Sequence, residues 1–169
     1  MNRPSVGDYP SFYQAYIDIA QGDSLNVLIA SYPAVIQHFF VDLPEDKADF
    51  SYAPGKWTIK QMLQHLIDTE RVFSYRALRI SRNDQTAMAG FDENAYAQNA
   101  PVSLRNLAEL KKEFLLIREA TDIQLKSFTE TQLKLSGIAS NHSITLNSIC
   151  FIIYGHNLHH MHMLKERYL

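Results

Sequence analysis

Four of the seven histidines of the chain lie within seven residues near the carboxyl end, in the stretch GHNLHHMHMLKERYL. They are His156, His159, His160 and His162. Imidazole nitrogens bind Zn²⁺, Ni²⁺, Cu²⁺ and Fe²⁺. In an α-helix, residues four positions apart lie on one face, about 40° apart around the axis. His156 and His160 have this spacing, so one helix can direct both rings to the same point.

The helix face that carries His156 and His160 is otherwise apolar, which predicts that it faces the core. Its other members are Ile149, Ile152, Ile153 and Met163. Two polar rings that point into a core, with no acidic residue beside them, need partners from another helix. We interpret His159 as a flanking residue and His162, which points nearly opposite to His156, as a surface residue.

A second helical segment supplies a further histidine. His65 shares an inward-facing sector with Met62, Thr69 and Val72. If the two helices pack side by side, His65, His156 and His160 converge on one cation. Three neutral imidazoles with a water in the fourth position form an open, catalytic type of zinc site. The spacing alone leaves the alternative of hydrogen-bonded core histidines open, and it does not distinguish zinc from nickel or iron.

Acidic and basic residues accompany His65 on its helix. Asp68 and Glu70 lie within one and a half turns of it, so they are candidates for general acid–base catalysis or for holding an imidazole N–H. Solvated carboxylates are the competing interpretation. One arginine of this helix can face an anionic substrate, and the pattern does not single it out. We expect the segment 90–93 to cover the mouth of a pocket, and Tyr52 and Trp57 to be packing residues.

Four long segments with helical periodicity must position these side chains. The predicted helices run from Leu25 to about Phe39 with a break at Pro33, from the N-cap Thr58 to about Arg82, from the N-cap Ser103 to about Phe128, and from near Thr145 to the end. A short helix is expected around Phe12–Ala20, inside an N-terminal extension of residues 1–22. The stretches between the helices are predicted to be loops.

Four helices in 169 residues predict an all-α four-helix bundle, with residues 1–169 as one domain. The connections are long, so the crossover topology stays open at this point. A net charge of −2 with no basic stripe disfavours nucleic acid as a partner. We find no run long enough for a membrane span and no signal peptide, and we expect a cytoplasmic protein. Cys150, the single cysteine, is expected to be a small core residue.

Three blocks of the chain together resemble the DinB-like and YfiT-like superfamily of metal-dependent enzymes. In the order of that family they are KWTIKQMLQHLIDTERVFSYRALRISRND, GFDENAYA and FIIYGHNLHHMHMLKERYL. The resemblance covers about residues 24–169. It implies an up-down-down-up four-helix bundle and a divalent metal held by one histidine of the second helix and two of the fourth. In this chain those residues are His65, His156 and His160. The resemblance also implies a homodimer.

Members of the resembled superfamily include transferases and isomerases that use low-molecular-weight thiols, and other relatives are labelled hydrolases. The first hypothesis is therefore a metal-dependent transferase that activates a small thiol for a small-molecule substrate, since coordination deprotonates a thiol. The alternative enzyme is a metal-dependent hydrolase of a small amide or ester, which uses water of lowered pKa. A third hypothesis is a non-catalytic metal-binding bundle, although structural zinc normally has four protein ligands.

Overall fold

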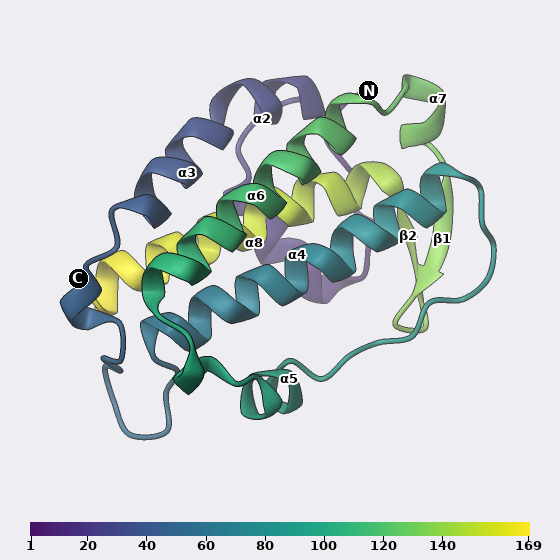
Figure 1. Cartoon of the computed structure of the whole chain (residues 1–169). Helices are drawn as coiled ribbons and strands as arrows, with labels where there is room; N and C mark the ends of the chain where they lie inside the picture. The colour runs from purple at the N-terminus through teal and green to yellow at the C-terminus, as the bar shows by residue number, and fades with distance from the viewer.

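Four helical rods form a bundle in the computed structural model, which describes all of residues 1–169 (Figure 1). The rods are α2 (Leu25–Ser31) continued by α3 (Pro33–Val41), α4 (Ile59–Ser81), α6 (Leu107–Lys126) and α8 (Leu146–Arg167). The α4 and α6 rods run in the same direction, and the other two run in the opposite direction. The prediction of an all-α, up-down-down-up four-helix bundle is confirmed. The loop between α4 and α6 has to return along the length of the bundle.

Side-chain caps set the starts of the long helices. Thr58 accepts a hydrogen bond from the backbone of Gln61, whose side chain accepts one from Thr58 in return. Thr145 caps α8 in the predicted place. The prediction of Ser103 as the cap of α6 is wrong, because Ser103 lies in a 3₁₀ turn (Val102–Leu104) and Asn106 is the cap. Asn106 has a glutamate three residues later that completes a capping box, and Ser103 has none.

The first rod is broken at Pro33, as predicted. Ser31 ends α2 and Pro33 opens α3, with Tyr32 between them. Proline has no backbone N–H and suits the first turn of a helix, where that group has no partner. The sequence rule for proline therefore locates this break to the residue.

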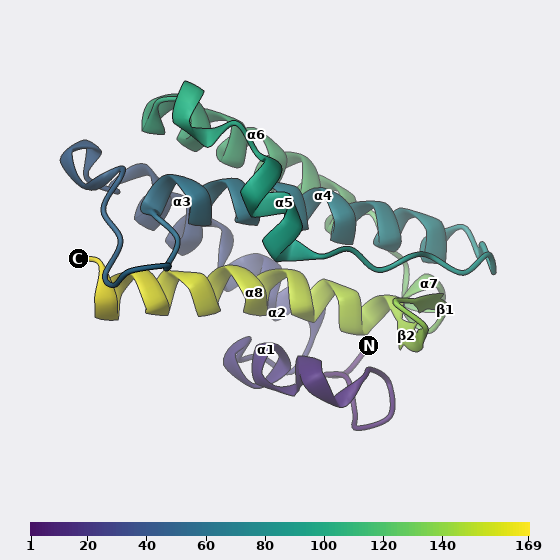
Figure 2. The same cartoon turned by 90° about the horizontal axis from the view of Figure 1, so that it is seen from below.

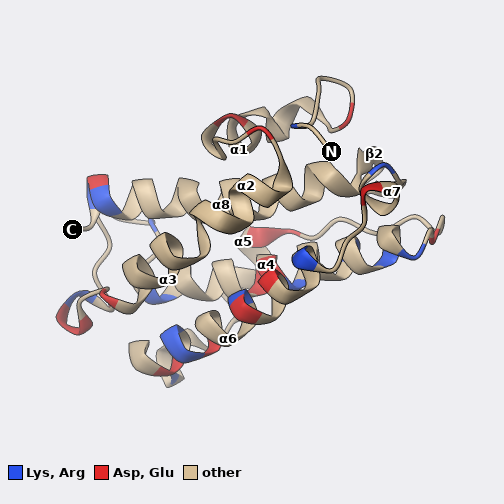
Figure 3. Cartoon of the chain, turned by 90° about the horizontal axis from the view of Figure 1, so that it is seen from above, with Lys and Arg blue, Asp and Glu red and all other residues tan.

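The α8 helix is the central element of the fold. It lies between α1 (Gln14–Ile19) and α4 (Figure 2), and it carries no charged residue before Lys165 (Figure 3). Most of its residues are buried, including Cys150, as predicted. No helix of the structure has the length and apolarity that crossing a membrane requires. The placement of α8 means that any polar side chain on it must find its partners inside the protein.

A small β-hairpin and several short helices lie where loops were predicted. The hairpin pairs β1 (Ser136–Ala139) with β2 (His142–Thr145), in a register that sets Ser136 opposite Thr145. Its turn places Ser140 and Asn141 at positive φ, which suits a two-residue hairpin. Strands of four residues are too short for alternation to be recognised. The additional helices are α5 (Glu93–Asn99) and α7 (Glu130–Leu133), with a 3₁₀ turn at Glu45–Lys47.

The N-terminal segment packs against the bundle. The predicted short helix is present, as the Ser11–Tyr13 turn followed by α1. It contacts α8 so closely that a Cβ atom at Gly155 would overlap the backbone carbonyl of Tyr16. The Ser148 hydroxyl donates to the carbonyl of Asp8 at 3.1 Å, which fastens the same segment. Glycine at position 155 is therefore what allows α1 to approach the middle of α8.

Candidate metal centre

Three histidine rings meet where α4 and α8 lie side by side. The Nε2 atom of His156 is 3.1 Å from Nε2 of His65 and 3.1 Å from Nε2 of His160. The ligand atoms of the three residues all lie within 4.8 Å of one another, and no other histidine, cysteine or carboxylate joins the group. The structure thus brings together the three histidines that the sequence singled out.

The arrangement of the nitrogens suits a divalent cation better than a set of hydrogen bonds. A neutral imidazole has one N–H and one lone pair, so Nε2 of His156 makes a good hydrogen bond to only one of its two neighbours. A cation accepts all three lone pairs at once. Nitrogens bound at about 2.0–2.1 Å in a tetrahedral arrangement lie about 3.3 Å apart, close to the observed spacing. The donor set therefore fits a cation with its fourth position open.

Burial keeps the three rings neutral. Desolvation lowers the pKa of His65 from its ordinary value of 6.5 to about 4. Burial also lowers the pKa of His156 and of His160, and the neighbouring rings lower both further. A neutral imidazole offers a lone pair to a metal, while an imidazolium does not. The rings are therefore ready to act as ligands at neutral pH.

The remaining ring nitrogens have few partners. The Nδ1 of His65 lies 3.5 Å from the hydroxyl oxygen of Thr69, one turn further along α4. The Nδ1 of His160 is buried and has no hydrogen-bond partner in the protein. Leaving a buried polar atom unpaired costs about 1–3 kcal/mol. The polar contact of the His160 ring is made by its Nε2 atom, which lies 3.1 Å from Nε2 of His156.

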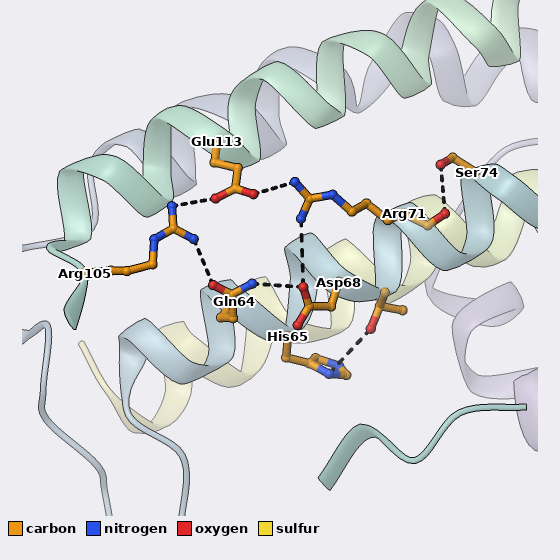
Figure 4. A network of polar contacts seen from close by, with 8 residues as sticks. Gln64, His65, Asp68, Arg71, Ser74, Arg105 and Glu113 are labelled. Atoms are coloured by element: carbon orange, nitrogen blue, oxygen red, sulfur yellow. Dashed lines mark hydrogen bonds and ion pairs between the residues drawn. The ribbon is translucent and has the colours of Figure 1, made fainter. Parts of the chain in front are cut away.

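The two acidic residues that the sequence suggested as catalytic lie away from the rings. Asp68 lies between two side chains of its own helix: it accepts a hydrogen bond from Gln64 at 2.9 Å and lies 3.9 Å from Arg71 (Figure 4). Burial raises the pKa of Asp68, partly offset by Gln64 and Arg71. Glu70 is buried against Arg118 and Asn157. Neither carboxylate lines the cavity beside the histidines, because Asp68 leaves α4 toward α5 and the loop before α6, while Glu70 leaves it toward the buried side chains of Arg118 and Asn157.

A cavity of about 420 Å³ opens beside the three rings. Its walls come from the N-terminal segment, α4, α8 and the loops on either side: Phe12, Tyr13, Tyr16, Trp57, His65, Thr69, Phe73, Arg76, Phe91, Glu93, Ser140, His156, His159 and His160. Phe91 and Glu93 belong to the segment that was expected to cover the pocket mouth. Within this lining, Arg76 and Glu93 are the only residues with permanent charges of opposite sign.

Sequence reasoning missed several residues of this wall. Trp57, expected to be a packing residue, lies against His65, with the ring centroids 4.9 Å apart and the ring planes tilted by 42°. The centroid of the Tyr16 ring lies 5.4 Å from that of His156 and 5.5 Å from that of His159. His159, expected to be a flanking residue, therefore lines the cavity. His162 is exposed, as expected. The signal that was available is Gly155, because a glycine inside a helix often marks a close backbone approach.

Comparison with known proteins agrees with this picture. A model of the DinB superfamily matches residues 30–164. A protein of Bacillus subtilis (strain 168) with the name "Putative metal-dependent hydrolase YfiT" is 26% identical over 171 residues, covering 95% of this chain and 90% of the relative. The relative "Putative metal-dependent hydrolase OB0782" of Oceanobacillus iheyensis is 26% identical over 95 residues, covering 49% and 55%.

A solved structure has the same fold. It is YfiT from Bacillus subtilis, described as a probable metal-dependent hydrolase with an unusual four-helix bundle topology. The TM-score is 0.72 at 18% identity, with 96% of this chain and 89% of that chain covered. At this identity the likeness establishes the fold alone. The family match spans most of the residues that build the bundle and includes all three clustered histidines, so the chain belongs to the DinB superfamily.

Proposed function

We propose that this protein is a metal-dependent hydrolase of a small amide or ester, with His65, His156 and His160 as the metal ligands. The observation that carries the proposal is the convergence of three neutral imidazoles, without a fourth protein ligand, on the wall of an open cavity. A bound divalent metal at such a site lowers the pKa of water to about 7 and so supplies a nucleophile at neutral pH. The names of the two relatives support the same reaction class.

The side chains around the rings have separate tasks in this reaction. Water adds to the substrate carbonyl carbon, the bond to oxygen or nitrogen breaks, and the proton released by the water passes to the leaving group. Burial raises the pKa of Tyr13 and of Tyr16, so both hydroxyls stay protonated and are able to donate a hydrogen bond to the substrate oxygen. Glu93 is the carboxylate that lines the cavity, and we assign it the transfer of the proton. Trp57 and Phe73 add apolar rings to the same cavity wall.

Thiol transfer, the first hypothesis from the sequence, uses the same open position. No residue of the cavity favours a thiol over water, and the relatives are named for hydrolysis. A non-catalytic metal site fits less well, because a structural zinc normally has four protein ligands. We therefore rank hydrolysis first and keep thiol transfer as an outcome of the test.

The test uses untagged protein loaded with Zn²⁺, Ni²⁺, Fe²⁺ or Co²⁺. We expect hydrolysis of p-nitrophenyl esters or p-nitroanilides by the loaded wild type, and none above background by His156→Ala. His162→Ala is the matched control, because it removes an exposed imidazole from the same helix. Equal rates for the loaded wild type and His156→Ala would overturn the proposal. A new sulfur-to-cobalt absorption band with one member of a thiol panel, without hydrolysis, would replace it with thiol transfer.

A further inference from the structure

Arg76 is a buried cation without a carboxylate partner. Of the three arginines on α4, Arg71 pairs with Glu113 and Arg79 pairs with Asp84, and both are more exposed than Arg76. Arg76 is 3% exposed and forms no ion pair. A charged group at this level of burial is normally paired, because leaving water is costly for a charge. The positive charge of Arg76 is therefore not compensated by an ion pair within the protein.

The hydrogen bonds of Arg76 hold its guanidinium in place but involve only one of its three nitrogens. One terminal nitrogen, Nη2, donates to the carbonyl of Ala89 at 3.0 Å and to the hydroxyl of Ser140 at 2.9 Å. The ring of Phe73 lies against the guanidinium, 5.7 Å from Cζ to the ring centroid. The other nitrogens, Nε and Nη1, form no ion pair, and the nearby group on the cavity wall is the neutral hydroxyl of Tyr13, whose pKa burial raises more than the Arg76 charge lowers it. The free edge of the fork is thus available to a ligand, in the geometry that binds an oxyanion through two N–H groups.

The position of Arg76 relates it to the histidine centre. His65, Thr69, Phe73 and Arg76 follow one another along one face of α4 and all line the cavity. Eleven residues of helix span about 16 Å along the axis, and side chains tilt toward the N-terminal end, so Arg76 leans back toward His65. The Phe73 ring lies between Arg76 and the histidine centre along this face, and its centroid is 6.2 Å from that of the His156 ring. A ligand that reaches both must be elongated and apolar in its middle.

We propose that Arg76 binds an oxyanion at the end of the substrate remote from the bond that is cleaved, so that the substrate is a small acyl compound with an apolar spacer and a terminal carboxylate or phosphate. That the ligand is a substrate rests on the proposed function. That it carries an anion rests on Arg76 alone. The aromatic side chains of Phe12, Phe73 and Phe91 line the space for the spacer. Glu93, the carboxylate of this lining, is exposed and forms no ion pair with Arg76.

The test measures binding by metal-free protein, so that a carboxylate cannot bind to a metal instead. The probes are 3-phenylpropionate, phenyl phosphate and the neutral 3-phenylpropionamide, titrated by calorimetry. We expect wild type to bind at least one anion about tenfold or more tighter than the amide, because charge-assisted hydrogen bonds exceed neutral ones. The stronger of the two anions identifies the oxyanion class. In Arg76→Met the preference should vanish while binding of the amide stays within about twofold.

Two further measurements separate ligand binding from a structural role of Arg76. Arg79→Met removes a neighbouring cation of the same helix and should keep the preference for the anion. If Arg76→Met fails to fold, the Nε–Hε resonance of Arg76 in wild type provides the readout, and it should move with the acid but not with the amide. Equal affinities of acid and amide in wild type, or a preference that survives Arg76→Met, would overturn the inference. Because no metal is present, the result is independent of whether the loaded protein hydrolyses esters.

Discussion

Two polar clusters are buried in this bundle, and they are built on opposite principles. The charge cluster consists of Glu70, Arg118, Asp122, Tyr154 and Asn157. Arg118 is 0% exposed and forms ion pairs with both Glu70 and Asp122, while the Tyr154 hydroxyl donates to Asp122 at 2.8 Å. The histidine centre holds three groups of the same kind that present lone pairs to one another, beside an open cavity. In the charge cluster opposite charges pair away from solvent, although Arg118 Nε and Asn157 Oδ1 have no partner, and such a cluster serves the fold. The histidine centre brings together like groups beside an open cavity, which suits a ligand.

The two clusters also share their helices. Glu70 follows His65 by little more than one turn of α4, and Asn157 is the neighbour of His156 on α8. Asn157 donates to Glu70 at 3.1 Å, so the charge cluster links the two helices beside the rings. We infer that the charge cluster fixes the spacing and rotation of α4 against α8 and thereby sets the geometry of the histidine centre. The following predictions test this division of roles.

The largest expected effect is the loss of metal from His156→Ala. His156 is the histidine whose Nε2 atom lies 3.1 Å from Nε2 of both others, so its removal takes away the central nitrogen of the three. We expect binding of one equivalent of Zn²⁺ or Co²⁺ by wild type, and an affinity at least about 100-fold lower in the variant, more than the usual effect of outer-shell partners. Metal analysis after dialysis measures this. Circular dichroism should show an unchanged helical content, and unfolding of the variant would instead assign the rings to the fold.

Arg118→Met should have the next largest effect, on stability. Removing one partner of a buried ion pair leaves uncompensated charge, here Glu70 and Asp122, and costs about 3–5 kcal/mol. Urea unfolding measures the loss. The control is Arg71→Met, whose half-exposed pair with Glu113 should contribute about 0–1 kcal/mol. A loss for Arg118→Met as small as that of the control would contradict the role of the charge cluster in the fold.

Acid should weaken the metal-free bundle through the histidine centre. The pKa of His65 is about 4 in the folded protein and about 6.5 when unfolded, so between these values the unfolded chain binds more protons. The free energy of unfolding therefore falls as the pH falls from about 6.5 to 4, by up to about 1.4 kcal/mol per pH unit for this ring. Urea titrations across that range measure the slope. His65→Leu should reduce the slope, and an unchanged slope would mean that the ring titrates as it does in water.

The long helices and the histidine centre could be predicted from the sequence because the patterns that indicate them are local. Helical spacing places His156 and His160 together, and an apolar sector places His65 inward. The cavity wall could not be predicted, because Tyr16 and Trp57 reach the site through tertiary packing that no short sequence spacing encodes. Position on a helix likewise did not reveal that Asp68 contacts Gln64 and Arg71 of its own helix and that Glu70 forms an ion pair with Arg118. The role of such a residue depends on which side chain packs against it from another helix. The sequence indicates that neighbour only indirectly, as Gly155 indicates the close approach of α1.

The smallest predicted effect concerns Thr69, the one hydroxyl near an outer nitrogen of the histidine centre. Its oxygen lies 3.5 Å from Nδ1 of His65, long for a hydrogen bond but able to fix the ring tautomer that leaves Nε2 free for a metal. Thr69→Val keeps the shape and removes the acceptor, so we expect a roughly tenfold weaker metal affinity, about 1.4 kcal/mol. Competition with a metal-sensitive dye measures it, and Thr69→Ser, which keeps the hydroxyl, is the control. If Thr69→Val binds metal as tightly as wild type, the orientation of His65 is set by packing against Trp57 alone, and the histidine centre depends even more on the fold around it.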